Sequence, residues 1–313
     1  MTDISITGGT GFLGSYLVRT LADASKHKLS GLTRRVSMLD DPSAVHWTHG
    51  DLGSVEDCRR FVESARIIIH LAHSTSPLTS DRDLPADVQL NLLPSMNLLQ
   101  AIREAGTTPH VIYASSGGAT YGPRRRRKPV GELTPCRPLS SYGIVKLAIE
   151  QYLHSGADQG WVRSTVLRIG NPYGVLLPME RTQGFIGVAL NRIVHGEPVR
   201  LIGNPNNVRD YVHLHDVALF VERVLEVKTR YALYNVGSGE GRSVTDILGL
   251  LSQLTKLPAR VERAAPTDAA RALPSWIVLD ISRARKELGW TPSVDFYEGL
   301  QSLCREALCS VPR

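Results

Sequence analysis

The sequence predicts an α/β fold, a doubly wound parallel sheet with a smaller, partly interleaved C-terminal lobe. Through the first 169 residues, strand-like apolar runs alternate with stretches of helical periodicity, and such repeated βα units form parallel sheets covered on both faces. A glycine-rich turn follows the first apolar run directly. Beyond residue 170, prolines punctuate shorter elements, which indicates a second, smaller lobe.

The elements of the first part can be placed in order along the chain. The run at 66–72, RIIIHLA, is apolar almost throughout, as is typical of a strand buried on both faces of a parallel sheet. Helices are expected where apolar residues recur at helical spacing, at 12–24, 91–105 and 142–154. The other expected strands are 3–7, 29–33, 45–48, 110–115 and 164–169.

Composition and charge exclude several function classes. With 42% hydrophobic and 21% charged residues, the chain has the composition of a globular enzyme, and no apolar run approaches the ~20 residues of a membrane span. The N-terminus reads as a first strand rather than a signal peptide, so we expect a cytoplasmic protein without a membrane partner. The net charge of +6 suits an anionic ligand such as a diphosphate.

Neither nucleic-acid binding nor a metal site is expected. The basic run 124–128 lies between two prolines, in a predicted loop without interleaved aromatic residues. The cysteines form no CxxC pair and have no histidine-rich surroundings, so we expect reduced thiols. They are Cys58, Cys136, Cys304 and Cys309.

Residues 7–14, TGGTGFLG, are interpreted as a dinucleotide-binding loop. Their glycines satisfy G-x-G-x-x-G directly after a predicted strand and at the start of a predicted helix, which is the context that this motif requires. Glycine lets the backbone approach a pyrophosphate, and the helix offers its first amides to the charge. The residues expected at the cofactor here are Gly8, Gly11, Phe12, Leu13 and Gly14.

This loop makes the first part of the chain a predicted Rossmann domain. We assign to it residues 1–169, with returning segments near 209–237. Residues 170–208 and 238–313 are assigned to a substrate-binding lobe.

The end of the second predicted strand, GLTRR, bears on the choice of dinucleotide. An acidic residue usually stands there when the ligand is NAD, whereas this chain has Thr33, Arg34 and Arg35. A guanidinium can clamp a 2′-phosphate, so the sequence favours NADP. NAD stays possible if both arginines face solvent. Asp51, in the GDL that follows the third predicted strand, is expected at the adenine amine.

Tyr142 and Lys146 form the expected acid–base pair. They stand four residues apart in YGIVK, so they project from one face of a predicted helix. A phenol is a poor acid or base at neutral pH, and a nearby ammonium favours its phenolate form. Upstream, SSGGATYG at 115–122 places hydroxyl groups at the carboxyl end of a strand, where parallel sheets bind ligands.

With these motifs the chain resembles the extended short-chain dehydrogenase/reductase family, and within it the nucleotide-sugar epimerases and dehydratases that include UDP-glucose 4-epimerases. The resemblance covers nearly the whole chain. Its further landmarks are HLA (70–72), Asn91 with its NLL, LRIGNPYG (167–174), RDYVHLHDVA (209–218), YNVGSGEGRSV (234–244) and ELGWTPSV (287–294).

The resemblance implies roles for individual residues. Tyr142 would exchange a proton with a sugar hydroxyl, and Lys146 would bond the nicotinamide ribose and lower the tyrosine pKa. Asn171 would contact the substrate, and Arg209 would pair with its diphosphate. The plainer interpretations are a turn cap for Asn171 and a local ion pair with Asp210 for Arg209. Further implied contacts of cofactor or substrate are Leu52, Leu71, Ala72, Asn91, Gly117 and Asp268.

The catalytic hydroxyl depends on the register of the loop. Counting forward along the strand VIYASS places Ser116 at the family's catalytic serine or threonine, whereas counting back from the Tyr121–Gly122 landmark places Gly117 there. Strand register is the more rigid constraint, so we favour Ser116, with Ser115 and Thr120 as alternatives.

Two departures from the family pattern matter. Dehydratases of this branch carry an Asp-Glu pair after the catalytic hydroxyl, and this chain has glycine and alanine there, which disfavours a 4,6-dehydratase. The family's second diphosphate-binding arginine is replaced by Ala265. Candidates to replace it are Arg260, Arg263 and Arg271.

We therefore expect a nucleotide-sugar 4-epimerase, acting on a UDP-hexose by reversible hydride transfer from the sugar C4 to bound NAD(P). The alternatives are an NADPH-dependent reductase of a 4-keto nucleotide sugar and a non-catalytic dinucleotide sensor. The resemblance also implies a homodimer, with the helices at 91–105 and 142–154 in the interface.

Overall fold

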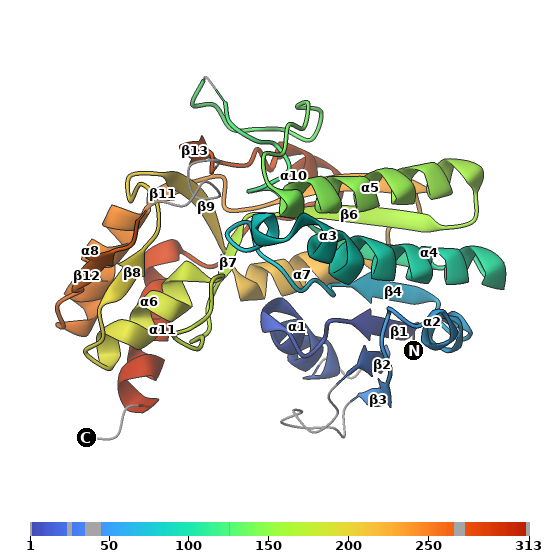
Figure 1. The fold of residues 1–313 in the computed structure, drawn as a ribbon, viewed down its shortest axis with the longest axis horizontal. Coiled ribbons are helices and arrows are strands. Elements are labelled where there is room, and N and C mark those ends of the chain that lie inside the picture. The colour runs from blue at the N-terminus through green and yellow to red at the C-terminus, as the bar shows by residue number, and fades with distance from the viewer. Residues whose placement is uncertain (1, 24–26, 35–44, 125, 266–272, 311–313) are drawn as a thin grey trace.

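The computed structural model describes residues 2–23, 27–34, 45–124, 126–265 and 273–310 (Figure 1). Seven strands form one wholly parallel sheet in the order β3-β2-β1-β4-β5-β6-β10. The predicted doubly wound parallel sheet is confirmed. The strands are β1 (Thr2–Thr7), β2 (His27–Thr33), β3 (His46–His49), β4 (Ile67–His70), β5 (His110–Ser116), β6 (Arg163–Ile169) and β10 (Tyr231–Val236).

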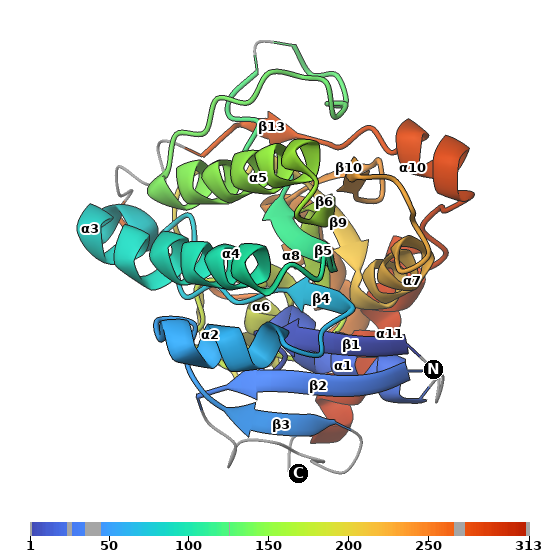
Figure 2. The ribbon, with the colours of Figure 1, turned by 90° about the vertical axis from the view of Figure 1, so that its right-hand side faces the viewer.

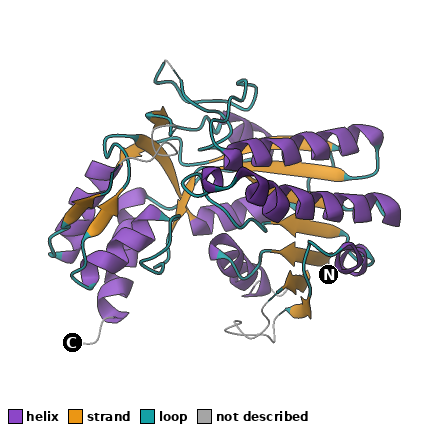
Figure 3. Cartoon of the chain, viewed as in Figure 1, coloured by secondary structure: helices purple, strands orange, loops and turns teal. Residues whose placement is uncertain are grey.

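Helices cover both faces of this sheet (Figures 2 and 3). Alternation along β4 explains why, since Ile69 belongs to the core on one face and Ile68 to the core on the other. The first face carries α1 (Phe12–Asp23), α7 (Leu214–Val224) and α10 (Ser282–Leu288). The second carries α2 (Val55–Val62), α4 (Leu93–Ala105) and α5 (Ser141–Gln159).

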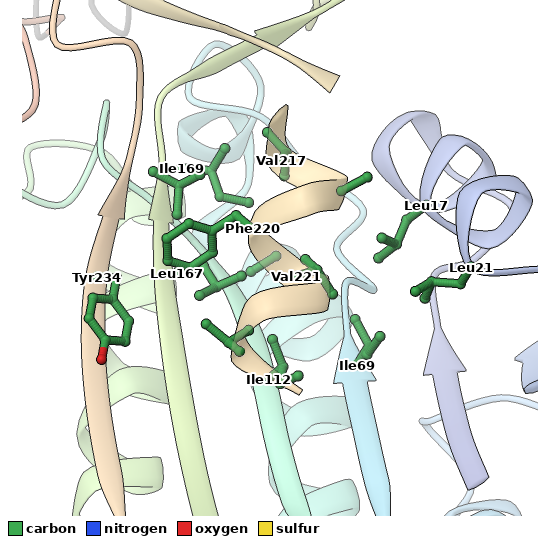
Figure 4. Packing of buried hydrophobic residues seen from close by; sticks show 14 of the residues in the cluster. Leu17, Leu21, Ile69, Ile112, Leu167, Ile169, Val217, Phe220, Val221 and Tyr234 are labelled. Atoms are coloured by element: carbon green, nitrogen blue, oxygen red, sulfur yellow. The ribbon is translucent and has the colours of Figure 1, made fainter. Parts of the chain in front are cut away.

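Close packing on the first face fixes the start of α1, which the glycine loop precedes. Leu17 and Leu21 of α1 and Phe220 of α7 are fully buried (Figure 4). They pack in one cluster with Ile69 and Ile112 of the central strands. Burying side chains of this size stabilises the fold by roughly 1.5–3 kcal/mol each, so α1 is held firmly against the sheet.

Two predicted helices differ from the structure in detail, and one observed helix was not predicted. The helix expected from 91 is preceded by α3 (Leu84–Asp87) and a π-helical turn, η3 (Val88–Leu92), which continues into α4. The helix expected to end at 154 runs on to Gln159, where Gly160 adopts a left-handed conformation with φ of 82°. Helix α2 was not predicted, because four of its eight residues, VEDCRRFV, are charged and the apolar pattern is weak.

The second lobe has its own sheets and core. Strand β9 pairs with β7, β11 and β13, and β8 pairs with β12. Buried residues from α6, α8 and α11, including Leu190, Ile247 and Leu300, form a separate cluster. The elements are β7 (Asn171–Tyr173), α6 (Phe185–Val194), β8 (Val199–Leu201), β9 (Val208–His213), β11 (Gly241–Ser243), α8 (Val244–Thr255), β12 (Val261–Arg263), β13 (Trp276–Ile277) and α11 (Phe296–Ser310).

The chain crosses between the two parts more than once. Within the range 209–237, β9 pairs in the second lobe, α7 packs on the large sheet and β10 joins that sheet as its last strand. The carboxyl ends of β1, β4 and β5 therefore face a lobe built by later residues (Figure 1). No helix of the described ranges is both long and apolar enough to cross a membrane.

Candidate active site

A cavity of about 980 Å³ lies at the carboxyl ends of β1, β4 and β5. Strands β1 and β4 are neighbours at the point where the strand order reverses, which is where doubly wound sheets bind ligands. The lining starts at Thr7, the last residue of β1, and at Gly8, and it extends to Asn207 and Tyr211 of the second lobe. A volume of this size suits a small-molecule site shared by both parts of the chain.

The glycine loop forms one end of this cavity. Gly8 has a φ of 72°, in the region that favours glycine, and a Cβ there would come within 2.6 Å of Ala72 N. A Cβ at Gly14 would overlap the carbonyl oxygen of Gly8. Gly11 N donates to Gly8 O at 3.0 Å, just before α1 begins at Phe12. The loop thus fits a pyrophosphate, because the backbone can approach it closely and the first turn of α1 presents its amides.

The other residues expected at the cofactor lie on the same cavity, apart from Arg35, which is outside the described residues. Thr33 is buried at the end of β2, and Arg34 beside it is exposed. Arg34 Nη1 lies 3.8 Å from Asp51 Oδ2, a solvent-exposed contact that stabilises little. The remaining cavity residues of this set are Phe12, Leu13, Leu52, Leu71, Ala72 and Asn91.

Tyr142 and Lys146 reach the cavity from the first turns of α5. The helix start is fixed by Ser140, whose Oγ accepts from Gly143 N at 3.3 Å. Lys146 is buried, and its Nζ donates to Ala114 O at 2.7 Å. The same Nζ lies 5.7 Å from the centroid of the Tyr142 ring. The pair therefore stands beside β5, which β4 separates from β1 and its glycine loop.

Burial sets the protonation of this pair in the free protein. It raises the pKa of Tyr142 to about 12, while hydrogen bonding with Ser116 and Gln183 acts in the opposite direction. Burial lowers the pKa of Lys146 to about 7, against the attraction of the Glu150 carboxylate. Burial is thus the largest cause of the raised pKa of Tyr142, and Lys146 is not among the groups that shift it.

The structure separates the three candidate hydroxyls. Ser116 lines the cavity, and its side chain acts to lower the pKa of the Tyr142 phenol. The Ser115 hydroxyl donates instead to the buried carboxylate of Glu150. Thr120 is fully buried, and its Oγ1 donates to Ser116 O at 2.7 Å. Of the three, only the Ser116 hydroxyl is placed to share a proton with Tyr142.

Replacing Ser116 by Ala should lower kcat about 10-fold, because the phenol expected to exchange the proton loses the hydroxyl beside it. Thr120→Val serves as the matched control and should retain turnover, since it removes a hydroxyl that faces the protein interior. Initial rates on a verified substrate measure both. Full activity in Ser116→Ala together with loss in Thr120→Val would reverse the assignment.

A buried carboxylate ties the start of α5 to the loop after β4. Asp87, 1% exposed, accepts from Ser141 Oγ at 2.6 Å and from Thr75 Oγ1 at 2.5 Å. Asn91 Nδ2 donates to the same carboxylate at 2.8 Å, and its Oδ1 accepts from Ser74 N at 2.6 Å. Asn91 and Asp87 thus connect the loop after β4 with the start of α5, next to Tyr142. Asp87 also raises the pKa of that phenol, though less than burial does.

Asn171 and Arg209 line the cavity from the second lobe. Arg209 Nη1 donates to Val208 O at 2.8 Å, and burial lowers the pKa of its guanidinium. Asp210 is not its partner, because that carboxylate accepts from Ser238 N at 2.7 Å and from Ser238 Oγ at 2.8 Å. The Arg209 charge therefore remains available to an anionic ligand.

Other residues expected at the substrate are placed differently. Gly117 does not line the cavity; its N donates to Ile169 O at 2.8 Å, and a Cβ there would lie 2.7 Å from Leu279. It therefore backs the cavity wall. Asp268 and Arg271 lie outside the described residues. Neither Arg260 nor Arg263 lines the cavity. The described arginines that do are Arg34, Arg181 and Arg209.

Several cavity residues were not predicted, among them His73, Arg181 and Gln183. His73 follows β4 directly, and its position at the carboxyl end of a buried strand was a usable signal. Arg181 and Gln183 come from the loop between β7 and α6, and Arg181 lies 5.8 Å from the ring centroid of Phe12. Nothing in the local pattern of that loop marks it as part of the site. The described residues contain no cluster of histidine, cysteine or acidic side chains that could hold a metal ion.

The sequence and the structure were compared with protein families and with known proteins. Residues 4–237 match the model of the "NAD dependent epimerase/dehydratase family". The chain belongs to this family. The expected relationship to nucleotide-sugar epimerases and dehydratases is therefore confirmed, and the glycine loop and the Tyr–Lys pair both lie within the matched region.

Members of the NAD dependent epimerase/dehydratase family match almost the whole chain. It is 28% identical to dTDP-4-dehydro-6-deoxyglucose reductase of Escherichia coli, over 98% of each protein. The structure of a Thermus thermophilus UDP-glucose 4-epimerase in complex with NAD superposes with a TM-score of 0.90 and 29% identity, covering 99% of this chain and 100% of the other. A Thermotoga maritima UDP-glucose 4-epimerase with UDP-glucose gives a TM-score of 0.88, 28% identity and coverage of 98% and 100%.

Proposed function

We propose that the protein is a nucleotide-sugar 4-epimerase that uses bound NAD(P), with a UDP-hexose as its substrate. The observation that carries the proposal is the convergence of the glycine loop, the Tyr142–Lys146 pair and the guanidinium of Arg209 on one cavity. A similar fold holds NAD in the Thermus epimerase and UDP-glucose in the Thermotoga epimerase. Both ligand types suit the polar groups of this cavity.

The chain's own residues would act in fixed positions. Arg209 would hold the substrate diphosphate, and Asn171 would bind near the sugar. Tyr142 would take the proton of the sugar hydroxyl and later return it. The Ser116 hydroxyl would form a hydrogen bond with the phenol during this exchange. Lys146, held by Ala114 O, would bond the nicotinamide ribose. When bound, the nicotinamide supplies a hydride acceptor that is regenerated in each turnover.

The test is incubation of the purified protein with UDP-glucose, UDP-N-acetylglucosamine and further nucleotide sugars, without added reductant. We expect chromatography to reveal the 4-epimer of at least one of them. No epimer across the panel would contradict the proposal. If no epimer formed but the protein oxidised NADPH in the presence of a 4-keto nucleotide sugar, the result would support the second candidate, a reductase. Arg34 favours that candidate, since a reductase consuming NADPH needs a 2′-phosphate site.

Arg34 also carries a prediction about cofactor choice. We propose that its exposed guanidinium leaves Asp51 and binds the 2′-phosphate of NADP. Arg34→Ala should then weaken NADP binding about 10-fold, the value of one charge-assisted hydrogen bond, and leave NAD binding unchanged. Titration calorimetry with both dinucleotides measures this. An equal loss of affinity for NAD and NADP would show instead that Arg34 binds a part of the cofactor that both dinucleotides share.

We propose that the protein is a homodimer. The outer surfaces of η3, α4 and α5 expose several large apolar side chains, among them Leu90, Leu93, Ile144 and Tyr152, each at least half exposed. Exposed apolar residues gathered on neighbouring helices are typical of an interface. Light scattering should give about twice the chain mass of 34.3 kDa, and the mass of a single chain at micromolar concentration would rule the dimer out.

A further inference from the structure

The loop between β7 and α6 reaches from the second lobe to the loop that follows β4. The Oγ1 of Thr182 and the Oγ of Ser76 share a hydrogen bond at 3.2 Å. Gln183 Nε2 donates to Thr75 O at 3.5 Å. Thr75, Thr182 and Gln183 all line the cavity. These contacts fix the β7–α6 loop against the first part of the chain, directly after Arg181.

Arg181 lies beside the glycine loop. Its guanidinium carbon, Cζ, is 5.8 Å from the centroid of the Phe12 ring, and both residues line the cavity. Phe12 is the first residue of α1 and follows Gly11 directly. The first amides of a helix and the positive end of its dipole attract anions. An anion held at the start of α1 would therefore have the Arg181 charge close to it.

The charge of Arg181 is not used within the described ranges. There its guanidinium has no ion-pair or hydrogen-bond partner, and lost hydration lowers its pKa without any carboxylate acting in the opposite direction. Arg192 of α6 differs, because its Nη2 donates to Met179 O at 2.9 Å and its Nη1 to Pro198 O at 3.1 Å. A guanidinium that loses hydration without gaining a protein partner is suited to bind an anionic ligand.

We propose that Arg181 binds the pyrophosphate of the bound dinucleotide, together with the first amides of α1. The nucleotide sugar of the proposed function carries a diphosphate of the same chemistry, and the contact with Phe12 favours that of the dinucleotide. The inference rests on the proposed function for the presence of both ligands. It makes a residue of the second lobe part of the cofactor site, so bound cofactor would connect the two lobes.

The test compares four proteins by titration calorimetry with NAD and with UDP, at low and at high salt. Arg181→Gln removes the charge, and Arg181→Lys keeps it. Arg200→Gln is the matched control, since Arg200 is an exposed arginine of the same lobe that does not line the cavity. Binding is measured apart from turnover, so a protein that binds both ligands without epimerising any sugar would contradict the proposed function only.

We expect Arg181→Gln to bind NAD about 10-fold more weakly at low salt, the value of one charge-assisted hydrogen bond. The difference should shrink at high salt, because salt screens an exposed charge. Arg181→Lys should lose less affinity than Arg181→Gln. The control protein, and all four proteins with UDP, should stay within about 2-fold of the unmodified protein.

Three results would overturn the inference. The first is an equal affinity of Arg181→Gln and the unmodified protein for NAD. The second is an equal loss in the Gln and Lys variants, because the charge would then not be the cause. The third is a loss for UDP without a loss for NAD, because Arg181 would then serve the diphosphate of the substrate.

Discussion

Tyr142→Phe should reduce kcat about 10³-fold, because the variant lacks the phenol placed to exchange a proton with the sugar hydroxyl, and such exchange contributes roughly 10²–10⁴-fold. The ring remains, so packing against His73 and the affinity for dinucleotide should be unchanged. The measurement is the initial rate on a verified nucleotide sugar, alongside a dinucleotide titration.

Helix α5 provides a matched control for this change. Tyr152 lies on the same helix but is 53% exposed, so Tyr152→Phe removes an equivalent hydroxyl far from the cavity. It should keep the full rate. If Tyr142→Phe turned over as fast as Tyr152→Phe, Tyr142 would not be the acid–base residue.

Arg168→Met should lower the free energy of unfolding by about 3–5 kcal/mol. Arg168 and Glu150 form an ion pair at 2.6 Å with side chains 4% and 1% exposed, and removing one partner leaves the other charge buried and unpaired. Glu150 also accepts from the hydroxyl of Ser115, a residue that lines the cavity. Urea denaturation followed by circular dichroism measures the loss.

An exposed pair in the same chain gives the comparison. Arg200 and Glu262 lie 3.3 Å apart with side chains 65% and 54% exposed, and surface pairs contribute about 0–1 kcal/mol. Arg200→Met should therefore change stability by less than about 1 kcal/mol. Similar losses in the two variants would show that burial does not govern the contribution of the Arg168–Glu150 pair.

The large sheet could be predicted because the apolar pattern of its strands is visible in the sequence. The run RIIIHLA is apolar almost throughout, which is typical of a strand covered on both faces, and the structure buries it between both cores. The end of α5 could not be predicted from periodicity. Ala157 is fully buried by tertiary packing and extends the helix beyond the last strongly apolar turn. Helix α2 was missed for the opposite reason, since only Cys58 and Val62 of it are buried.

The candidate site was predictable where one motif places a residue and unpredictable where distant segments meet. The glycine loop and the Tyr–Lys pair depend on local turns and helix spacing. The choice between Ser116 and Thr120 depends on which hydroxyl is buried, and Thr120 turns inward to Ser116 O. Arg181 reaches the site from the second lobe through a loop with no local pattern. The edge-to-face contact of His73 with Tyr142 joins two distant segments, and no sequence pattern records it.

The central claim is that one bound cofactor takes the hydride from the sugar C4 and returns it to the same carbon. The most direct measurement is incubation with UDP-glucose carrying deuterium at C4, without added reductant, followed by mass spectrometry of the products. We predict a 4-epimer that keeps the deuterium and no net change in the dinucleotide. Loss of the label from the sugar, or product formed only with stoichiometric oxidation of NADPH, would contradict the claim.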